Sequence, residues 1–516
     1  MLLEMAAEGA GERTALGSRS GGLSYAELLR LSRQSAIWLT SHAGQHAALM
    51  DGNSAAVPLL LFGSALAGRT FVPISYRLAP EQLSAVLARL APGLLVTAGA
   101  TQAPDPLPAG LTVRTRDEML AAVRSGEPRS STAGSRAATG PGTATDPDDA
   151  AALLFTSGTT GAPKAAVLRH RQLVAYIIAS VEFLGAGADE AVLMSVPPYH
   201  IAGISGLLSN VYSGRRIVQL EVFDPASWVA VANAEHITHA MVVPTMLGRI
   251  LGVIRESGDP VPALRHLSYG GGRMPAQTIE LALRLLPRVD FVNAYGLTET
   301  SSTIAVLGPE DHRRFAASAD PAARRRLGSV GRPLPSVEIE VRAPDGAVAG
   351  PGVTGEVFVR GDQVAGEYLD GSRLDAGGWF ATRDEGFLDD DGYLFLAGRL
   401  DDVIVRGGED LSPGEIEDVL LAHPAVREVA VIGLPDPEWG EQVVAAVVPE
   451  AGASPDAPAL QRWVRERLRS SRTPSRVEFI PALPYTETGK VLRRTLREQL
   501  GVLAATAADP RPDRPA

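Results

Sequence analysis

Short apolar segments and longer amphipathic segments alternate through the middle of the chain. The apolar, β-rich runs cover residues 151–155, 191–196, 216–220, 239–243, 264–269 and 291–295. Helical patterns follow, as at 171–184 and 275–286. Strands that alternate with helices indicate parallel sheet with crossover helices. Ligands in such folds bind at the carboxyl ends of the strands, where the Gly/Thr-rich loops of this chain begin.

The pattern changes twice after residue 333. Strand-like runs at 337–342, 356–360 and 393–396 lack long helices between them, and a compact α+β segment follows residues 398–402. Within that segment, Ser412 and Pro413 form a helix start, with a serine cap, proline at the first position and glutamate at the third.

These patterns predict an α/β fold with two domains of unequal size. The large N-terminal domain (1–400) combines parallel-rich sheets and crossover helices with a β-rich subdomain. A small α+β C-terminal domain (401–502) follows, and then a disordered tail (503–516). The Ser/Thr/Gly/Pro-rich segment 124–149 predicts a flexible surface loop.

Composition narrows the class of protein. The 516 residues carry a formal net charge of -11 and no cysteine. The acidic balance argues against a nucleic-acid or anionic-membrane partner, and the lack of cysteine excludes disulfides and thiolate chemistry. The longest apolar stretch, 55–68, contains Pro58 and is shorter than the ~20 residues of a membrane span, so we expect a buried helix there. Without a secretory signal pattern at the N-terminus, we expect a cytoplasmic protein.

Lysine is almost absent from the chain. Only Lys164 and Lys490 occur among its 48 Lys and Arg residues, and both lie in Gly/Thr-rich loops, at 156–164 and 486–490. An ammonium is a compact point charge that a planar guanidinium does not replace where geometry is tight. The two loops are therefore candidates for binding anionic groups at close range, whereas chance placement is the alternative. The first loop is not a Walker A loop, because Pro163 stands where that motif needs glycine.

Several motifs together resemble the adenylate-forming superfamily, which includes acyl- and aryl-CoA synthetases. The loop at 156–164 resembles the family's phosphate loop, and residues 295–300 (Tyr-Gly-Leu-Thr-Glu-Thr) resemble its Tyr-Gly-x-Thr-Glu element. Residues 379–384, 398–416 and 484–490 resemble its Trp-x-x-Thr-Gly-Asp element, its hinge with the following glycine loop, and its catalytic-lysine loop. The motifs occur in the family's order over roughly residues 10–500.

The resemblance implies an ATP-dependent acid–thiol ligase. Such an enzyme joins a carboxylate to the α-phosphorus of ATP with release of pyrophosphate, and then passes the acyl group to CoA. Its cofactors are ATP, Mg²⁺ and CoA. Lys490, Thr298 and Glu299 are the implied catalytic residues, with Glu299 as the ligand of Mg²⁺, an ion that prefers oxygen ligands. The implied nucleotide-binding residues are Thr156, Ser157, Gly158, Thr159, Thr160, Lys164, Gly270, Gly271, Gly272, Asn293, Tyr295, Gly296, Asp384 and Arg399.

The resemblance also implies a mobile C-terminal domain. Asp401 matches the family hinge, and rotation about it would replace Lys490 at the site by the loop of Gly407 and Gly408 for thioester formation. The alternative for Asp401 is an ordinary loop aspartate. The chain departs from the family at Arg383, where the family has glycine before the ribose-binding aspartate. That arginine either restricts the backbone or adds a nucleotide contact.

Single residues of this set also have simpler interpretations. Tyr295 offers a ring for adenine stacking, and the alternative is a core aromatic. Asp384 is placed at the ribose hydroxyls, although acids in such stretches are usually solvated. Arg399 is placed at the nucleotide, and a surface salt bridge is the alternative.

The acyl pocket is expected from residues 199–205, the turn at 243–246, the glycines at 270–272 and the stretch after Leu297. His200 is placed at its carboxylate end as a further catalytic residue, and a packed core histidine is the alternative. Residues 201–208 contain no acid, which favours an uncharged hydrophobic carboxylic acid as substrate. CoA is the expected acceptor and a free carrier protein the second choice. A non-catalytic relative that only binds a carboxylate or a nucleotide is the remaining alternative.

Overall fold

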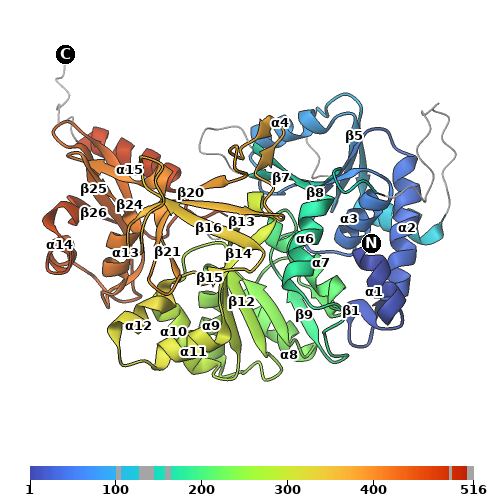
Figure 1. The fold of residues 1–516 in the computed structure, drawn as a ribbon, viewed down its shortest axis with the longest axis horizontal. Helices are drawn as coiled ribbons and strands as arrows, with labels where there is room; N and C mark the ends of the chain where they lie inside the picture. Colours follow the sequence, from blue (N-terminus) through green and yellow to red (C-terminus); the bar gives the residue numbers. More distant parts are fainter. Residues whose placement is uncertain (100–105, 127–144, 157–163, 487–490, 508–516) are drawn as a thin grey trace, which may run out of the picture.

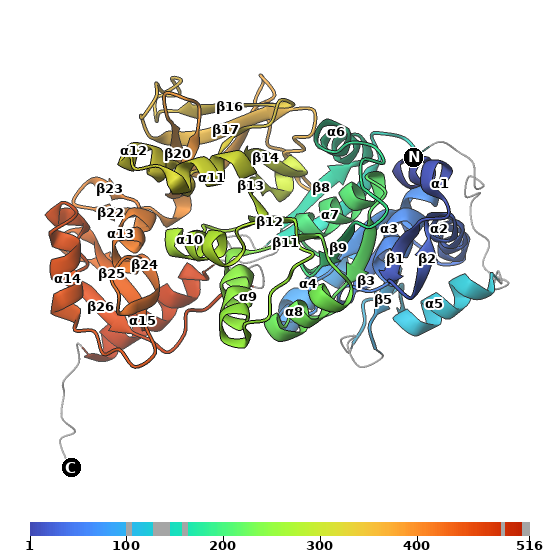
Figure 2. The same ribbon diagram turned by 90° about the horizontal axis from the view of Figure 1, so that it is seen from below.

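The structure is a computed structural model that describes residues 1–99, 106–126, 145–156, 164–486 and 491–507. Four β-sheets and the helices that cover them build this part of the chain (Figures 1 and 2). The helices are α1 (Leu2–Ala10), α2 (Tyr25–Thr40), α3 (Ala56–Leu66), α4 (Pro80–Leu90), α5 (Arg116–Ser125), α6 (His170–Ser180), α7 (Ile201–Tyr212), α8 (Pro225–Ala234), α9 (Pro244–Ser257), α10 (Ala276–Leu285), α11 (Pro309–Ala317), α12 (Pro321–Arg325), α13 (Pro413–Leu421), α14 (Ala457–Arg465) and α15 (Arg493–Ala507).

A nine-stranded sheet forms the centre of the molecule. In spatial order its strands are β15 (Arg332–Pro333), β14 (Ser302–Leu307), β13 (Asp290–Leu297), β12 (His266–Gly270), β11 (His239–Val242), β9 (Ala191–Met194), β10 (Arg216–Gln219), β1 (Thr14–Ser18) and β2 (Gly21–Ser24). The strands from β13 to β1 run parallel, and the pairs at both edges are antiparallel. This is the parallel sheet with crossover helices that the sequence pattern predicts.

An eight-stranded sheet lies beside it. Its strands in spatial order are β19 (Gly371–Ser372), β18 (Glu367–Tyr368), β8 (Lys164–Arg169), β7 (Ala150–Thr156), β4 (Thr70–Pro73), β3 (His46–Met50), β5 (Gly93–Thr97) and β6 (Leu111–Thr115). β7 is parallel to β4 but antiparallel to β8. The loop at 156–164 therefore joins two antiparallel strands and does not lead into a crossover helix.

The largest hydrophobic core lies between these two sheets. Leu16, Val192 and Ile217 of the nine-stranded sheet share it with Leu49 and Leu94 of the eight-stranded sheet. Successive residues of a strand face opposite sides, so Leu193 instead packs in the core cluster that includes Trp228 and Leu247 of α8 and α9. Helix α3 is buried on all sides, because it fills the space between the sheets. The apolar stretch at 55–68 is thus a buried helix, as expected.

Two smaller sheets follow the change of pattern after residue 333. The four-stranded antiparallel sheet consists of β16 (Val337–Arg342), β17 (Gly355–Gly361), β20 (Phe380–Leu388) and β21 (Leu394–Arg399). The last sheet has five strands: β23 (Glu409–Leu411), β22 (Ile404–Arg406), β25 (Gly440–Pro449), β24 (Val426–Asp436) and β26 (Arg476–Phe479). Helix α13 contributes Ile416 and Leu420 to the core of this last sheet.

Two local expectations need correction. Ser412 precedes α13 but makes no side-chain capping bond; its hydroxyl instead donates to the carbonyl of Ala397 at 2.6 Å. The hydroxyl thus ties the helix to β21. Helix α15 continues to Ala507, past the start of the predicted tail at 503, and residues 508–516 lie outside the described ranges.

A half-buried histidine is expected to make the large domain sensitive to acid. The ring of His239 stacks on His266 with centroids 4.5 Å apart, and its Nδ1 lies 2.9 Å from the Thr238 hydroxyl. Burial and the nearby cations lower the pKa of His239 to about 3. Glu190 lies 3.7 Å away, but its carboxylate is already paired with Arg215, so the lowered pKa is the direction that we expect.

The unfolded chain binds a proton at this histidine near the ordinary pKa of ~6.5, whereas the folded chain does not until about pH 3. Stability is therefore lost as the pH falls below 6.5. Between pH 7 and pH 5, the free energy of unfolding should fall in both proteins. We expect the fall in His239→Gln to be about 2 kcal/mol smaller than the fall in the wild type. Urea unfolding at both pH values, followed by tryptophan fluorescence, measures this difference. Equal losses in the two proteins would contradict the assignment.

Candidate active site

Three residues predicted at the nucleotide come together around one carboxylate. The Tyr295 hydroxyl donates to Asp384 Oδ2 at 2.6 Å, and Arg399 Nη1 donates to Asp384 Oδ1 at 2.7 Å. Arg399 Nη1 also donates to the carbonyl of Thr382 at 2.8 Å. Burial and the adjacent charge of Asp384 raise the pKa of Tyr295 well above its ordinary value, so the phenol stays a hydrogen-bond donor. Both oxygens of Asp384 are thus held in place by neighbouring side chains.

Strand geometry explains why these residues meet. β20 and β21 pair Asp384 directly with Arg399. On β13, the alternation of the strand puts Asn293 and Tyr295 on one buried face. The Asn293 amide donates to the carbonyl of Ser329 at 3.1 Å, so this side chain already holds the backbone beside the site.

A second carboxylate lies close to the first group. Glu299 is buried, and its Oε1 accepts a hydrogen bond from the hydroxyl of Tyr368 on β18. Burial and the charge of Glu299 raise the pKa of Tyr368 above its ordinary value. Desolvation lowers the pKa of Arg399, but Asp384, Tyr295 and Glu299 outweigh it and raise that pKa. We call Tyr295, Glu299, Tyr368, Asp384 and Arg399 the three-sheet cluster, because each of the first three sheets contributes to it.

Sequence reasoning missed Tyr368. It lies in a two-residue strand between Gly366 and Gly371, where no hydrophobic period marks it. Its position becomes clear only from the pairing of Tyr368 with Ala166 on β8. This pairing brings the strand that follows the phosphate loop to Glu299.

The turn that carries Glu299 is tightly folded. Thr298 is half-buried and begins the short 3-10 helix η2 (Thr298–Thr300). The backbone carbonyl of Glu299 accepts hydrogen bonds from the amides of Ala365 and Gly366, both at 2.9 Å. A Cβ at position 296 would lie 1.8 Å from the Ser302 carbonyl oxygen, so only glycine fits there. The predicted Gly296 therefore serves the close approach of β13 and β14.

The predicted phosphate loop is described only at its two ends. Thr156 ends β7 and Lys164 begins β8, and the two residues are paired across the strands. Lys164 is exposed at this edge. Ser157, Gly158, Thr159, Thr160 and Lys490 lie outside the described residues.

Elements expected at the acyl pocket lie side by side. The glycine loop (residues 270–272) follows β12, and Cβ atoms built on Gly271 and Gly272 would lie 3.6 and 3.8 Å from Val243 and Pro244. A Cβ on Gly270 would instead lie 2.2 Å from the carbonyl oxygen of Ala294. The hydroxyls of Ser205 on α7 and Ser302 on β14 lie 3.0 Å apart.

His200 stands at the start of α7. Its ring contacts Tyr199 at a centroid distance of 4.8 Å, and Tyr199 in turn meets Tyr76 edge-on at 5.6 Å. The histidine is half-buried. This aromatic environment agrees with a place in the pocket wall and also with the alternative of a packed histidine.

The arginine that replaces the family glycine contacts the predicted hinge. Arg383 has a φ of 63°, a left-handed conformation that glycine adopts without strain. Its Nη2 donates to Asp401 Oδ1 at 3.0 Å. Asp401 lies in η4 (Leu400–Asp402), and Gly407 and Gly408 form the turn between β22 and β23. The side chain of Arg383 thus contacts the predicted hinge residue.

The donor set suits a magnesium ion bound together with phosphates. Glu299 supplies a buried carboxylate beside the exposed end of β8. Within the described ranges no three acidic or histidine side chains gather into a metal site. Mg²⁺ is commonly held by one or two carboxylates, with substrate phosphates and waters completing its shell, and the residues present fit that mode.

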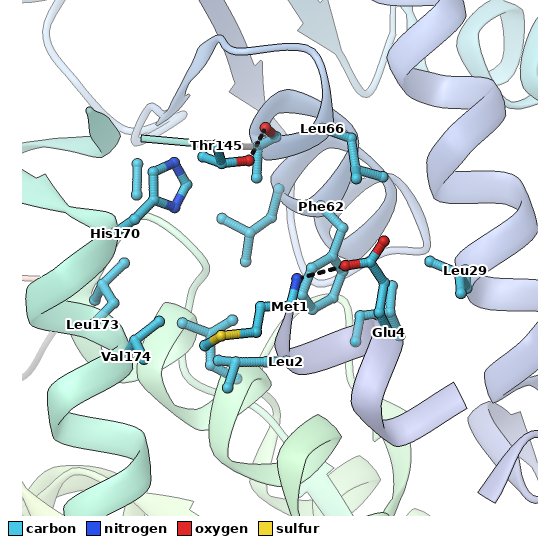
Figure 3. A pocket seen from close by; sticks show the side chains of 15 residues that line it. Met1, Leu2, Glu4, Leu29, Phe62, Leu66, Thr145, His170, Leu173 and Val174 are labelled. Atoms are coloured by element: carbon cyan, nitrogen blue, oxygen red, sulfur yellow. Dashed lines mark hydrogen bonds and ion pairs between the residues drawn. The ribbon is translucent and has the colours of Figure 1, made fainter. Parts of the chain in front are cut away.

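A separate apolar cavity lies near the N-terminus (Figure 3). Its volume is 110 Å³, and Leu2, Phe62, Leu173 and Val174 are among its lining residues. Met1 and Glu4 form an ion pair at its edge. No residue of the three-sheet cluster lines this cavity.

Comparison with known proteins decides the family. The model of the AMP-binding enzyme family matches residues 3–369, and that of the AMP-binding enzyme C-terminal domain matches residues 415–490. The chain belongs to the AMP-binding enzyme family. The predicted resemblance is thereby confirmed. No helix in the described part of this AMP-binding enzyme is long and apolar enough to cross a membrane.

Relatives span nearly the whole chain. A feruloyl-CoA synthase from Amycolatopsis sp is 33% identical and covers 94% of this chain and 95% of its own length. A fatty acid–[acyl-carrier-protein] ligase from Streptomyces coeruleorubidus is 32% identical, with 92% and 91% covered.

A solved structure confirms the predicted fold class. It is o-succinylbenzoate CoA synthetase from Bacillus subtilis with its acyl-adenylate, which has a TM-score of 0.80 at 27% identity and covers 100% of this chain and 99% of its own. The same synthetase with ATP and magnesium gives a TM-score of 0.81 at 28% identity, with 96% and 99% covered.

Proposed function

We propose that this AMP-binding enzyme is an ATP-dependent carboxylate–CoA ligase. The observation that supports the proposal is the three-sheet cluster, in which the buried carboxylates of Asp384 and Glu299 lie at one junction of the fold. We assign the first carboxylate to the ribose and the second to a metal ion. In the first half-reaction a substrate carboxylate oxygen bonds to the α-phosphorus of ATP, and the bond to pyrophosphate breaks. In the second, the CoA sulfur bonds to the acyl carbon, AMP leaves, and the thiol proton passes to solvent.

The residues act mainly by position and charge. An attack of one anion on another needs alignment and charge neutralisation more than acid–base chemistry. Asp384, held by Tyr295 and Arg399, accepts the ribose hydroxyls, and Glu299 holds the Mg²⁺ that neutralises phosphate charge. Lys164 and Lys490 supply the two compact cations, with Lys490 expected at the reacting oxygens. Asp401 serves as the hinge, and the turn of Gly407 and Gly408 serves the second half-reaction.

The proposed substrate is an uncharged hydrophobic carboxylic acid. The start of α7, the turn at 243–246 and the glycine loop offer small and apolar groups, without an acid at positions 201–208 to hold an ammonium. The 33% identical relative is a feruloyl-CoA synthase, which supports an aryl acid within this class. The fatty acid–[acyl-carrier-protein] ligase among the relatives favours a free carrier protein as the second candidate acceptor.

ATP–pyrophosphate exchange across a panel of carboxylic acids tests the proposal. We expect exchange with at least one uncharged aryl or aliphatic acid and none with amino acids of similar size. CoA and a phosphopantetheine-loaded carrier protein are then compared as acceptors by mass spectrometry. If no acid supports exchange, the enzyme is a binding protein and the proposal fails.

A further inference from the structure

One face of α13 is fitted to the glycine loop of the large domain. Arg273, the residue after the glycine loop, forms an ion pair with Asp418. Gln277 at the start of α10 donates to the carbonyl of Leu421 at 3.0 Å. Gly414, Asp418 and Leu421 are spaced by four and three residues, so they lie on one face of the helix. We call these three residues the docking face.

Gly414 makes room for the arginine. A Cβ at position 414 would lie 2.3 Å from Arg273 Nη1 and 2.6 Å from the carbonyl oxygen of Ala397. A glycine is less favourable in a helix than alanine, so its presence in the first turn of α13 needs a reason. The reason here is close contact, because no other residue leaves space for the guanidinium.

The arginine links two functional regions. On one side the backbone of the loop reaches Val243 and Pro244 at the expected acyl pocket. On the other side the Arg273 side chain reaches α13, which lies beyond the hinge residue Asp401 in sequence. Rotation about the hinge would therefore separate Arg273 from Asp418, whereas the pair of Arg383 and Asp401 is at the hinge itself.

The orientation seen here suits the first half-reaction. Gly407 at the hairpin tip donates its amide to the Trp439 carbonyl at 2.8 Å, and the neighbouring Arg406 donates to the Ser471 carbonyl at 2.8 Å. Both bonds lie within the C-terminal domain and move with it. The orientation of the domain shows in its exposed turn: among the described residues, a Cβ on Gly407 would meet only Trp439 of the same domain, and a Cβ on Gly408 would meet no atom within 4 Å. The turn that we propose for thioester formation therefore does not contact the three-sheet cluster in this orientation.

We propose that Arg273 is a positioning residue that docks the face of Gly414, Asp418 and Leu421 and so holds the C-terminal domain for adenylation. The inference rests on the proposed two-step function. The side chains of Arg273 and Asp418 are 46% and 52% exposed, so solvent weakens the pair. A weak contact suits a position that has to open in every catalytic cycle.

The rates of the two half-reactions test the proposal. We expect Arg273→Gln and Asp418→Asn each to slow adenylation about two- to fivefold, the range of an exposed ion pair. Thioester formation from added acyl-adenylate should stay unchanged or become faster. The exchanged pair, Arg273→Asp with Asp418→Arg, should recover part of the loss. Arg284→Gln is the matched control, because this exposed arginine lies on the same helix as Gln277 and enters no ion pair in the described part of the chain.

The thermal midpoint separates docking from stability. Arg273→Gln and Asp418→Asn each remove only a solvent-exposed ion pair, so the midpoint of each variant should stay close to that of the wild type. A lower midpoint with equal losses in both half-reactions would overturn the proposal, because it would show a structural role only.

A distance measurement tests docking without catalysis. The chain contains no cysteine, so Glu256→Cys on α9 and Arg462→Cys on α14 introduce the only two sites for spin labels. We expect a narrow distance distribution that broadens when Arg273→Gln is added. If no acid supports exchange but the distribution still broadens, the proposed function fails and docking stands. If exchange occurs and Arg273→Gln changes neither rates nor distances, the docking proposal alone is wrong.

Discussion

Lys490→Ala should lower ATP–pyrophosphate exchange by about 10²- to 10³-fold, the usual cost of removing one donor to a developing anion. The chain places one of its two lysines in this loop. The flanks of the loop are anchored, since Tyr485 is bridged to Val491 and donates to Glu428 at 3.0 Å. An ammonium carried on this loop would therefore be delivered with the C-terminal domain.

The effect should be confined to the first half-reaction. Thioester formation from added acyl-adenylate, measured by the release of AMP, should change by no more than about threefold. The reason is that the attack on the α-phosphorus and the release of pyrophosphate are already complete in the acyl-adenylate. Lys164→Ala is the matched control and should slow exchange by about tenfold or less, since Lys164 is exposed at the edge of the site. Equal losses of both half-reactions in Lys490→Ala would contradict domain rotation.

Glu299→Gln should lower adenylation by about 10²- to 10³-fold. The amide keeps the shape of the side chain but loses the charge that we propose as the ligand of Mg²⁺, and Tyr368 still has an oxygen to donate to. Adenylation measured over a range of Mg²⁺ concentrations should show a higher requirement for the ion. Partial recovery at high Mg²⁺ would support the role as a ligand.

Tyr368→Phe provides the comparison for this carboxylate. It removes the hydroxyl but leaves the charge of Glu299, so we expect a loss of about 10- to 150-fold, which corresponds to the ~1.5–3 kcal/mol of one hydrogen bond to a charged group. The Mg²⁺ requirement should stay close to that of the wild type. If Glu299→Gln showed the wild-type dependence on Mg²⁺, the metal would be held elsewhere.

Local periodicity predicts the regular parts of this fold well. The run at 337–342 is strand β16, and the runs at 191–196 and 239–243 contain β9 and β11. Each of these strands is long enough to show its own hydrophobic pattern. The two-residue strands β18 and β19 are too short for any period, and the antiparallel pairing of β7 with β8 depends on the fold around them.

The candidate site was predictable in its residues but not in its contacts. Motifs indicated Tyr295, Asp384 and Arg399, and the structure brings them together. Tyr368 was missed because its partner Glu299 is distant in sequence. The contact of Arg383 with Asp401 also required coordinates, since a left-handed φ at an arginine leaves no mark in the sequence.

The three-sheet cluster has a consequence for unfolding as well as for catalysis. Its members come from β13 and its turn, from β18, and from β20 and β21, which belong to three different sheets. A nucleotide bound there would contact all three, so it would act as a cross-link between these sheets. Because a ligand that binds only the folded state stabilises it by mass action, ATP would make the large domain melt more as one cooperative unit.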